Sequence, residues 1–275
     1  MRLARVEVDE GEVAAIEHRG ELHRVDRLDA ILGVALPDDV LPAGSFARRV
    51  LSLGVVTLAA HAEALADGTH LDDARLGKGA RLLPPTGADP VVLELPMDGR
   101  SVRSYRVSGR ALFGHGAAGL SARDAGPLLV APGLAIVLGE DLHLPSLGEA
   151  REAVLGVTLA LAWSLARERD AATAEGLGPS PARDVGTHLG PLLTAAFDLD
   201  VAVAAELTIG SAVTQTTLRA GTRRVAEALV HAARYGDLRA GDVLLIASGP
   251  ALPVAIGTSV SLRGEALGRL DGKIG

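Results

Sequence analysis

Two residues close together in the sequence have side chains that could do acid and base chemistry. Asp184 precedes His188 by four positions, just before the turn-forming run Leu189-Gly190-Pro191. A histidine with a carboxylate nearby can donate or accept a proton near neutral pH. The simpler interpretation is a loop histidine whose ring is satisfied by backbone or water. Without geometry, the simpler interpretation is favoured.

Other side chains could hold a substrate instead of reacting with it. Ser248 belongs to a Ser-Gly-Pro turn, where its hydroxyl could bind a substrate oxygen or simply complete the turn. Trp163 is the single tryptophan; it could form an apolar wall, although packing in the core is its commoner role. His115, between two glycines, Tyr105 and Arg103 could line the same mouth, with solvated surface as the default for the arginine.

The composition limits the class of protein. The chain has 275 residues, of which 48% are hydrophobic, enough for a substantial core. It has no cysteine, which excludes disulfides, thiolate zinc sites and a cysteine nucleophile. A net charge of −7, the lack of a basic run and only 2% aromatic residues argue against nucleic acid as a partner. The start resembles a strand, not a signal peptide, and the longest apolar run, 154–166, is too short for a membrane span. We therefore expect a soluble, cytoplasmic protein.

Residues 1–82 are expected to form a small N-terminal domain. Two alternating segments within residues 2–27 are separated by Asp-Glu-Gly, which is typical of a hairpin. A helical pattern follows, because Ser45 can cap a helix and apolar residues recur at helical spacing up to Asp67-Gly68. Pro84 and Pro85 neither continue a helix nor pair in a central strand, so a second domain is placed at residues 83–275.

The second domain consists of short apolar runs interrupted by glycine, which predict strands of a folded β-roll. Two helices are expected within it. One, from Ser146 to Ala166, begins with a capping-box pattern, and the other runs from Thr222 to Tyr235. The fold class is therefore α+β and mainly β. The expected strands lie at residues 91–95, 128–131, 134–138, 201–205, 243–247 and 260–262.

Five segments of this domain resemble, in order, motifs of the fumarylacetoacetate hydrolase family. Residues 105–116 are similar to its Phe-x-Lys-Pro…Leu-x-Gly-x-Gly segment, 134–139 to the strand after its paired glutamates, and 156–158 to Gly-Tyr-Thr. Residues 189–191 match a Leu-Gly-Pro turn, and 238–250 resemble a Gly-Asp-Val…Thr-Gly-Thr-Pro block. The resemblance implies a mixed β-sandwich roll with a small N-terminal α+β domain, a homodimer, a small keto or diketone substrate, and a position for His188 at the pocket.

The same comparison shows that the reactive positions of the family are missing here. The family holds a metal ion with a carboxylate triad, and the ion acts as a Lewis acid on an enolate oxygen. The three ligand positions hold Ala131, Gly133 and Ala162, whose side chains offer no oxygen. The two lysine positions hold Val107 and Pro181, and the lid segment lacks its histidine. We therefore expect no metal and no cofactor.

Three hypotheses remain. The first is a metal-independent relative that acts on a larger, more apolar keto or diketone substrate, for instance as a cyclase, dehydratase or decarboxylase in polyketide-like metabolism, through His188, Asp184, Tyr105 and Ser248. The second is a non-catalytic descendant that serves as a binding or structural partner. The third is an ordinary metal-dependent hydrolase or hydratase whose ligands come from elsewhere in the chain.

Overall fold

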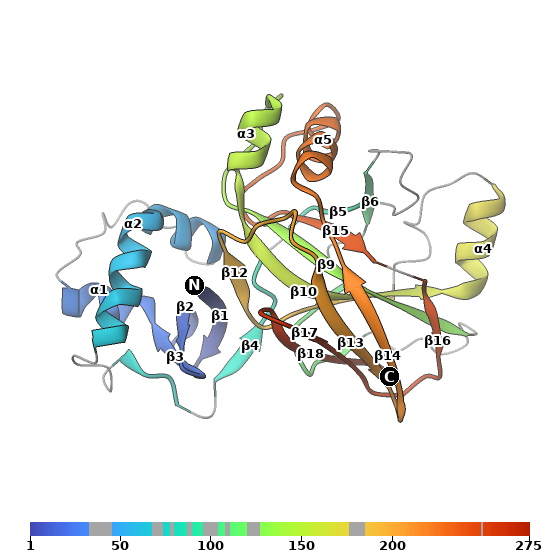
Figure 1. Cartoon of the computed structure of the whole chain (residues 1–275), viewed down its shortest axis with the longest axis horizontal. Coiled ribbons are helices and arrows are strands. Elements are labelled where there is room, and N and C mark those ends of the chain that lie inside the picture. Colours follow the sequence, from blue (N-terminus) through green and yellow to red (C-terminus); the bar gives the residue numbers. More distant parts are fainter. Residues whose placement is uncertain are drawn as a thin grey trace.

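Two β-sheets form most of the molecule, with five helices at their edges among the described residues (Figure 1). The computed structural model describes residues 1–32, 46–67, 74–77, 80–86, 90–95, 104–107, 111–119, 127–175, 185–248 and 250–275. None of the helices in these ranges is long and apolar enough to cross a membrane.

The larger sheet has thirteen strands among the described residues, with β3-β2-β1-β12-β10-β9-β15-β5-β6 as its main path. β11 pairs with β10, β7 with β11, β16 with β9 and β4 with β1. The strands are β1 (Arg2–Val8), β2 (Gly11–His18), β3 (Glu21–Arg24), β4 (Arg81–Leu83), β5 (Val92–Glu94), β6 (Tyr105–Val107), β7 (Leu112–Phe113), β9 (Leu128–Leu138), β10 (Val154–Leu165), β11 (Thr187–Leu189), β12 (Leu193–Ala195), β15 (Val243–Ala247) and β16 (Leu252–Val254).

The smaller sheet has five strands in the order β14-β13-β17-β18-β8 within the described part of the chain. Its strands are β8 (Ala118–Gly119), β13 (Val203–Ile209), β14 (Ala212–Leu218), β17 (Val260–Gly264) and β18 (Gly268–Ile274). The helices are α1 (Val25–Leu32), α2 (Phe46–Asp67), α3 (Leu147–Glu152), α4 (Ala166–Ala174) and α5 (Thr222–Ala233). The largest apolar core joins the two sheets and α5, and it includes Leu134, Leu161 and Trp163 from the larger sheet and Leu207 and Leu262 from the smaller one.

The expected helix from Ser146 to Ala166 was wrong over most of its length. Its start is confirmed, because the Ser146 hydroxyl accepts from the Glu149 N–H and the Glu149 carboxylate accepts from the Ser146 N–H. The helix ends at Glu152, however, and the apolar run that follows is β10. β10 is central in the sheet and buried on both faces, so it carries a continuous apolar run that periodicity cannot distinguish from a buried helix.

Most other expected elements are confirmed. The N-terminal hairpin is β1 and β2, the helical pattern up to Asp67 is the single helix α2, and the final helix is α5. The runs 128–131 and 134–138 are not two strands but the single strand β9, which continues through Pro132. Ser45 lies outside the described residues. The division into 1–82 and 83–275 stays a prediction, since residue 83 is the last residue of β4.

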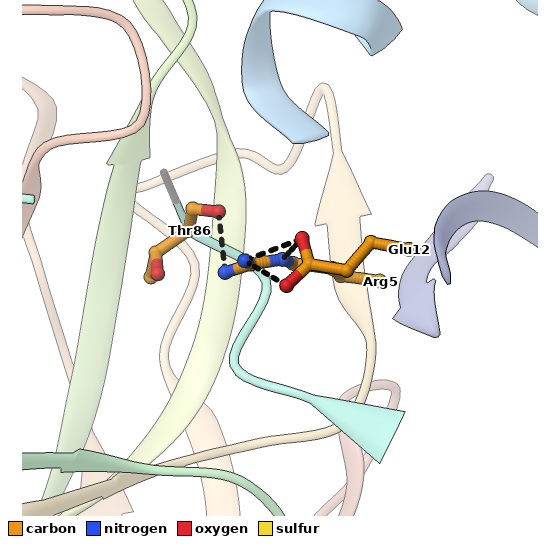
Figure 2. A network of polar contacts seen from close by, with 3 residues as sticks. All are labelled: Arg5, Glu12 and Thr86. Atoms are coloured by element: carbon orange, nitrogen blue, oxygen red, sulfur yellow. Dashed lines mark hydrogen bonds and ion pairs between the residues drawn. The ribbon is translucent and has the colours of Figure 1, made fainter. Parts of the chain in front are cut away.

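The N-terminal hairpin is tied to the segment that follows the two prolines. Arg5 on β1 donates from Nε and Nη2 to the Glu12 carboxylate on β2, at 2.9 Å and 2.6 Å (Figure 2). Its Nη1 donates to the Thr86 carbonyl at 3.2 Å. Arg5 is buried, and the planar guanidinium can serve both partners at once because its donors form a rigid fork. β1 also pairs with β12, so the hairpin extends the larger sheet.

Candidate functional site

The register of β9 against β10 brings the three expected ligand positions onto one face of the larger sheet. Ala162 is the direct cross-strand partner of Ala131, and Ala160 is the partner of Gly133. Cross-strand partners share a face, and so do residues two apart on one strand. Ala131, Gly133 and Ala162 therefore lie together on this face, and all three are buried.

Gly133 has no space for any side chain. A Cβ at this position would lie 2.4 Å from the Ile246 carbonyl oxygen and 3.0 Å from the Ala247 Cα, both backbone atoms of β15. Backbone atoms at this distance cannot rotate away as a side-chain end could. A carboxylate at residue 133 would therefore require β9 and β15 to separate.

The face around these positions is apolar. Val107 on β6, at one of the expected lysine positions, packs against the same cluster as Ala160 and Ala162. Val107 is the register partner of Val92 on β5. One expected lysine position, Val107, and one expected ligand position, Ala162, thus belong to one apolar surface. The cluster consists of Val92, Ala135, Ala160, Ala162, Leu189, Val243 and Leu245, with Val107 and Leu112 packed against it.

His188 and Trp163 lie on the opposite face of the sheet. His188 on β11 pairs with Leu161, and Trp163 belongs with Leu161 to the core between the two sheets. The Trp163 indole N–H donates to Nδ1 of His188 at 3.0 Å. Because side chains alternate along β10, Trp163 and His188 face the core between the sheets, whereas Ala162 lies on the opposite face of the larger sheet.

Both ring nitrogens of His188 are engaged in hydrogen bonds. Because Nδ1 accepts from Trp163, Nε2 carries the hydrogen and donates to the Ala117 carbonyl at 2.9 Å. The ring is fully buried beside Phe113, at 5.3 Å between ring centroids. Burial lowers the pKa of His188 against the opposing effect of the Ala117 carbonyl. A neutral ring with both nitrogens occupied is held in place and has no free position for a substrate proton.

Tyr105 lies on the apolar face, next to a carboxylate that the sequence analysis did not single out. Tyr105 on β6 is the register partner of Glu94 on β5, and Glu94 is only 4% exposed. Glu94 and Val92 are two residues apart, so Glu94 shares the face of the apolar cluster. A glutamate inside the apolar run Val91-Val-Leu-Glu-Leu95 was the signal that could have identified it, because buried carboxylates are rare without a role or a partner.

Ser248 follows the end of β15 and is 1% exposed. Its backbone N–H donates to the Pro132 carbonyl at 2.7 Å, so only the hydroxyl is available to a ligand. The hydroxyl oxygen is buried and has no hydrogen-bond partner. Buried polar atoms are nearly always paired in native proteins, so an orphaned hydroxyl beside the Gly133 backbone marks a place where a polar ligand atom would be stabilised.

Of the remaining expected site residues, the structure describes only His115. His115 lies in the turn before β8, where its Nδ1 accepts from the Asp271 N–H on β18 at 3.1 Å. It therefore belongs to the smaller sheet. Asp184, Arg103 and Pro181 lie outside the described residues, and the proposed roles of the two charged residues stay predictions.

Asp242, in the Gly-Asp-Val segment, has a structural role. Its carboxylate accepts from the Val91 N–H at 2.7 Å and from the Arg239 N–H at 2.8 Å, which fastens β5 to the start of β15. Burial raises the pKa of Asp242 despite these two hydrogen bonds. The segment thus holds the strand that carries Glu94 in register.

The residues at the expected metal site do not fit a divalent cation. Such an ion needs several anionic or carbonyl oxygens, and the face around Ala131 and Ala162 offers methyl groups. Within the described ranges, no group of three or more histidine, aspartate or glutamate side chains is placed to hold a metal ion. We therefore derive no step through a metal.

A family model, fumarylacetoacetate hydrolase C-terminal, matches residues 104–274, which is more than half of the chain. The chain belongs to the fumarylacetoacetate hydrolase family. The fold class is confirmed as the mainly β fold of this family with a small N-terminal α+β region. None of the curated proteins matches the sequence.

Solved structures of similar fold cover the whole chain at low sequence identity. Maleylpyruvate hydrolase from Sphingobium sp. SYK-6, in complex with manganese (II) ion and pyruvate, has a TM-score of 0.71 and 19% identity, over 100% of this chain and 98% of that chain. 5-Carboxymethyl-2-hydroxymuconate delta-isomerase from Mycobacterium smegmatis has a TM-score of 0.69 and 18% identity, over 100% and 99%. Fumarylacetoacetate hydrolase from Exiguobacterium antarcticum has 0.67 and 17%, over 100% and 99%.

The close approach at Gly133 predicts the effect of the smallest side chain. Gly133→Ala should lower the free energy of unfolding by about 1–3 kcal/mol, because the new methyl group meets β15 backbone. Gly148→Ala on α3 is the matched control, since its nearest atom would be 3.8 Å away and alanine favours a helix. Urea unfolding followed by circular dichroism measures both. An unchanged midpoint for Gly133→Ala would show that the strands can separate and admit a ligand side chain.

The buried state of His188 predicts a pH dependence of stability. Its pKa is lowered in the fold from the ordinary 6.5, so the unfolded chain binds the proton more readily. The stability that the neutral His188 ring contributes to the fold is fully present above pH 6.5. It is lost as the pH falls toward the pKa of His188 in the folded chain, and the free energy of unfolding then decreases by up to about 1.4 kcal/mol per pH unit. His188→Gln should remove this slope between pH 7.5 and 5.5 in urea unfolding. The exposed His143→Gln is the control, and parallel profiles for His188→Gln and the unsubstituted chain would contradict the assignment.

Proposed function

We propose that this chain is a family member that acts on an apolar keto or diketone substrate without a metal ion. The observation that carries the proposal is the convergence of Ala131, Gly133 and Ala162 on one face of the sheet, with Gly133 closed by backbone. The site keeps the geometry of the scaffold and replaces its charges with hydrocarbon. Such a surface favours a substrate with a large apolar body.

Hydroxyl groups replace the cation as the partners of the substrate oxygens. The Ser248 hydroxyl and the Tyr105 phenol donate hydrogen bonds to a carbonyl oxygen, and their donation strengthens as that oxygen gains negative charge. The Glu94 carboxylate, beside Tyr105 in the register, accepts the proton from the carbon between two carbonyls. Enolisation of this kind is the first step of an aldol cyclisation and of the dehydration that follows it, and the apolar walls orient the chain that reacts. Decarboxylation of a β-keto acid would give the same enolate by loss of carbon dioxide, without proton transfer to Glu94.

A non-catalytic role is the second candidate, favoured by one observation. His188, the expected base, is held between Trp163 and Ala117 in the core. A family member with this histidine as a packing residue could bind a diketone, or a second copy of the chain, without turning it over. A homodimer stays a prediction from the family resemblance, and a cytoplasmic location stays a prediction from the composition of the sequence. The third hypothesis, ligands displaced to other residues, would need residues outside the described ranges.

The metal requirement is tested by manganese binding. Titration of the full chain with Mn²⁺, followed by electron paramagnetic resonance of the free ion, should show no stoichiometric binding, and a chelator should leave the melting temperature unchanged. Maleylpyruvate hydrolase from Sphingobium sp. SYK-6 serves as the positive control, because its structure is in complex with manganese (II) ion. One tightly bound Mn²⁺ per chain, with a chelator-sensitive melt, would support displaced ligands and overturn the proposal.

The Ser248 hydroxyl predicts a separation of binding from stability. Ser248→Ala should weaken binding of 1,3-diketones with alkyl tails about 5- to 30-fold, the loss of one hydrogen bond. Its unfolding midpoint should be unchanged or raised, because the buried hydroxyl has no partner to lose. Calorimetry, enol absorbance and product mass spectra measure binding and turnover.

Ser211→Ala, at the exposed turn between β13 and β14, is the control for the serine substitution. Tight binding without turnover would support the non-catalytic candidate. Equal binding by Ser248→Ala and the unsubstituted chain would remove Ser248 from the site, and no binding of any diketone would contradict the proposed substrate class.

A further inference from the structure

We propose a second ligand site, for an amphipathic amine with an aliphatic body and one ammonium group. The site is a groove between α2 and the adjoining ends of β9, β10 and β12. It does not depend on the proposed function, and its lining shares no residue with the candidate site. We call it the α2 groove; it is lined by Leu58, Ala62, Ala153, Val154, Leu155 and Ala195, with three glutamates at the surface.

The α2 groove has the size of a small-molecule site. Its volume is about 510 Å³, within the range of 300–1,000 Å³ that is usual for ligand pockets. Five parts of the chain form it: Met1, the second half of α2, the segment after β9, the junction of α3 with β10, and the end of β12. Aliphatic side chains form most of its floor, which would hold a straight alkyl chain by burial of apolar surface.

The charges at the groove all have one sign. Glu63 on α2, Glu140 after β9 and Glu152 on α3 line it, and no lysine or arginine is among the lining residues. Within the described part of the chain, none of the three carboxylates has a hydrogen-bond or ion-pair partner. Met1 also lines the groove, and the side chains of the lining carry a net negative charge. A cation placed over this floor would be attracted by carboxylates that approach from three elements.

An organic ammonium fits these observations better than a metal ion or an anion. The three carboxylates are not placed to coordinate one metal ion, since no such group of three occurs among the described residues. An anionic ligand would be repelled by the carboxylates. An alkylamine instead lays its chain on the apolar floor and leaves its ammonium in contact with water and the glutamates, as lysine side chains do on protein surfaces.

The groove is well separated from the candidate functional site. Gly139, which lines the groove, lies six residues beyond Gly133 along β9 and its end, about 20 Å for an extended chain. A ligand in the groove would contact α2 of the N-terminal region and β10 of the sheet together. Amine binding should therefore stabilise the junction of these two regions and raise the melting temperature of the chain.

The test compares three ligands that differ only in the head group: n-octylamine, n-octanol and n-octanoate, each titrated below its micelle concentration into the full chain at low salt. Calorimetry should show saturable binding of the amine at least tenfold tighter than the alcohol, with no binding of the carboxylate. The triple variant Glu63→Gln, Glu140→Gln and Glu152→Gln should bind the amine no better than the alcohol. In the unsubstituted chain, 0.5 M sodium chloride should likewise remove the preference for the amine over the alcohol.

Two further variants keep the test specific. Ala62→Trp, at a half-buried position of α2 that lines the groove, should fill the groove and abolish amine binding while circular dichroism stays that of the folded chain. Glu175→Gln, an exposed glutamate after α4, should bind as the unsubstituted chain does. Equal affinity for amine and alcohol, an unchanged triple variant, or binding that survives Ala62→Trp would each overturn the proposal. Ser248→Ala should leave amine binding unchanged, which separates this outcome from that of the proposed function.

Discussion

The antiparallel pairing of β9 with β10 is the contact on which the rest of the molecule depends. It runs along all eleven residues of β9 and nearly all twelve of β10, with one irregularity between Val154 and Gly156. Because side chains alternate along both strands, this pairing decides for each residue which of two apolar environments it enters. A slip of one residue would exchange the two sets, placing Trp163 and Leu161 where Ala162 and Ala160 now lie.

The two faces of the larger sheet at β9 and β10 differ in the size and polarity of their side chains. One face carries large side chains into the core between the sheets, with His188 fixed there by Trp163 and Ala117. The other face carries alanine, glycine and valine at the positions where the sequence resemblance predicts the family's metal ligands and lysine. Several buried charges are mutually dependent, since removing one partner leaves the others uncompensated. Replacing them together by small apolar residues avoids that penalty, and Glu94 and Tyr105 are polar residues on the same face.

Much of this could be predicted from the sequence, and the failures have a common cause. The capping box at Ser146 and the strands at 243–247 and 260–262 depend on local signals, and each is confirmed. The long apolar run after Glu152 gave no local signal, because a strand buried on both faces and a buried helix have the same composition. The face on which His188 lies could not be predicted from local sequence either. His188 is close to the Leu-Gly-Pro turn in sequence, but a single step along β11 determines whether it faces the vacated positions or the opposite core.

By itself the sequence determined the family, the mainly β fold and the absence of anionic oxygens at residues 131, 133 and 162. These follow from residue identities and their order along the chain. Only the tertiary structure decided that those three positions converge, that backbone closes Gly133, that Glu94 joins Tyr105, and that His188 is packed away from them. Each of these depends on the register between strands far apart in the sequence, and register is fixed by the packing of whole faces and not by any local run of residues.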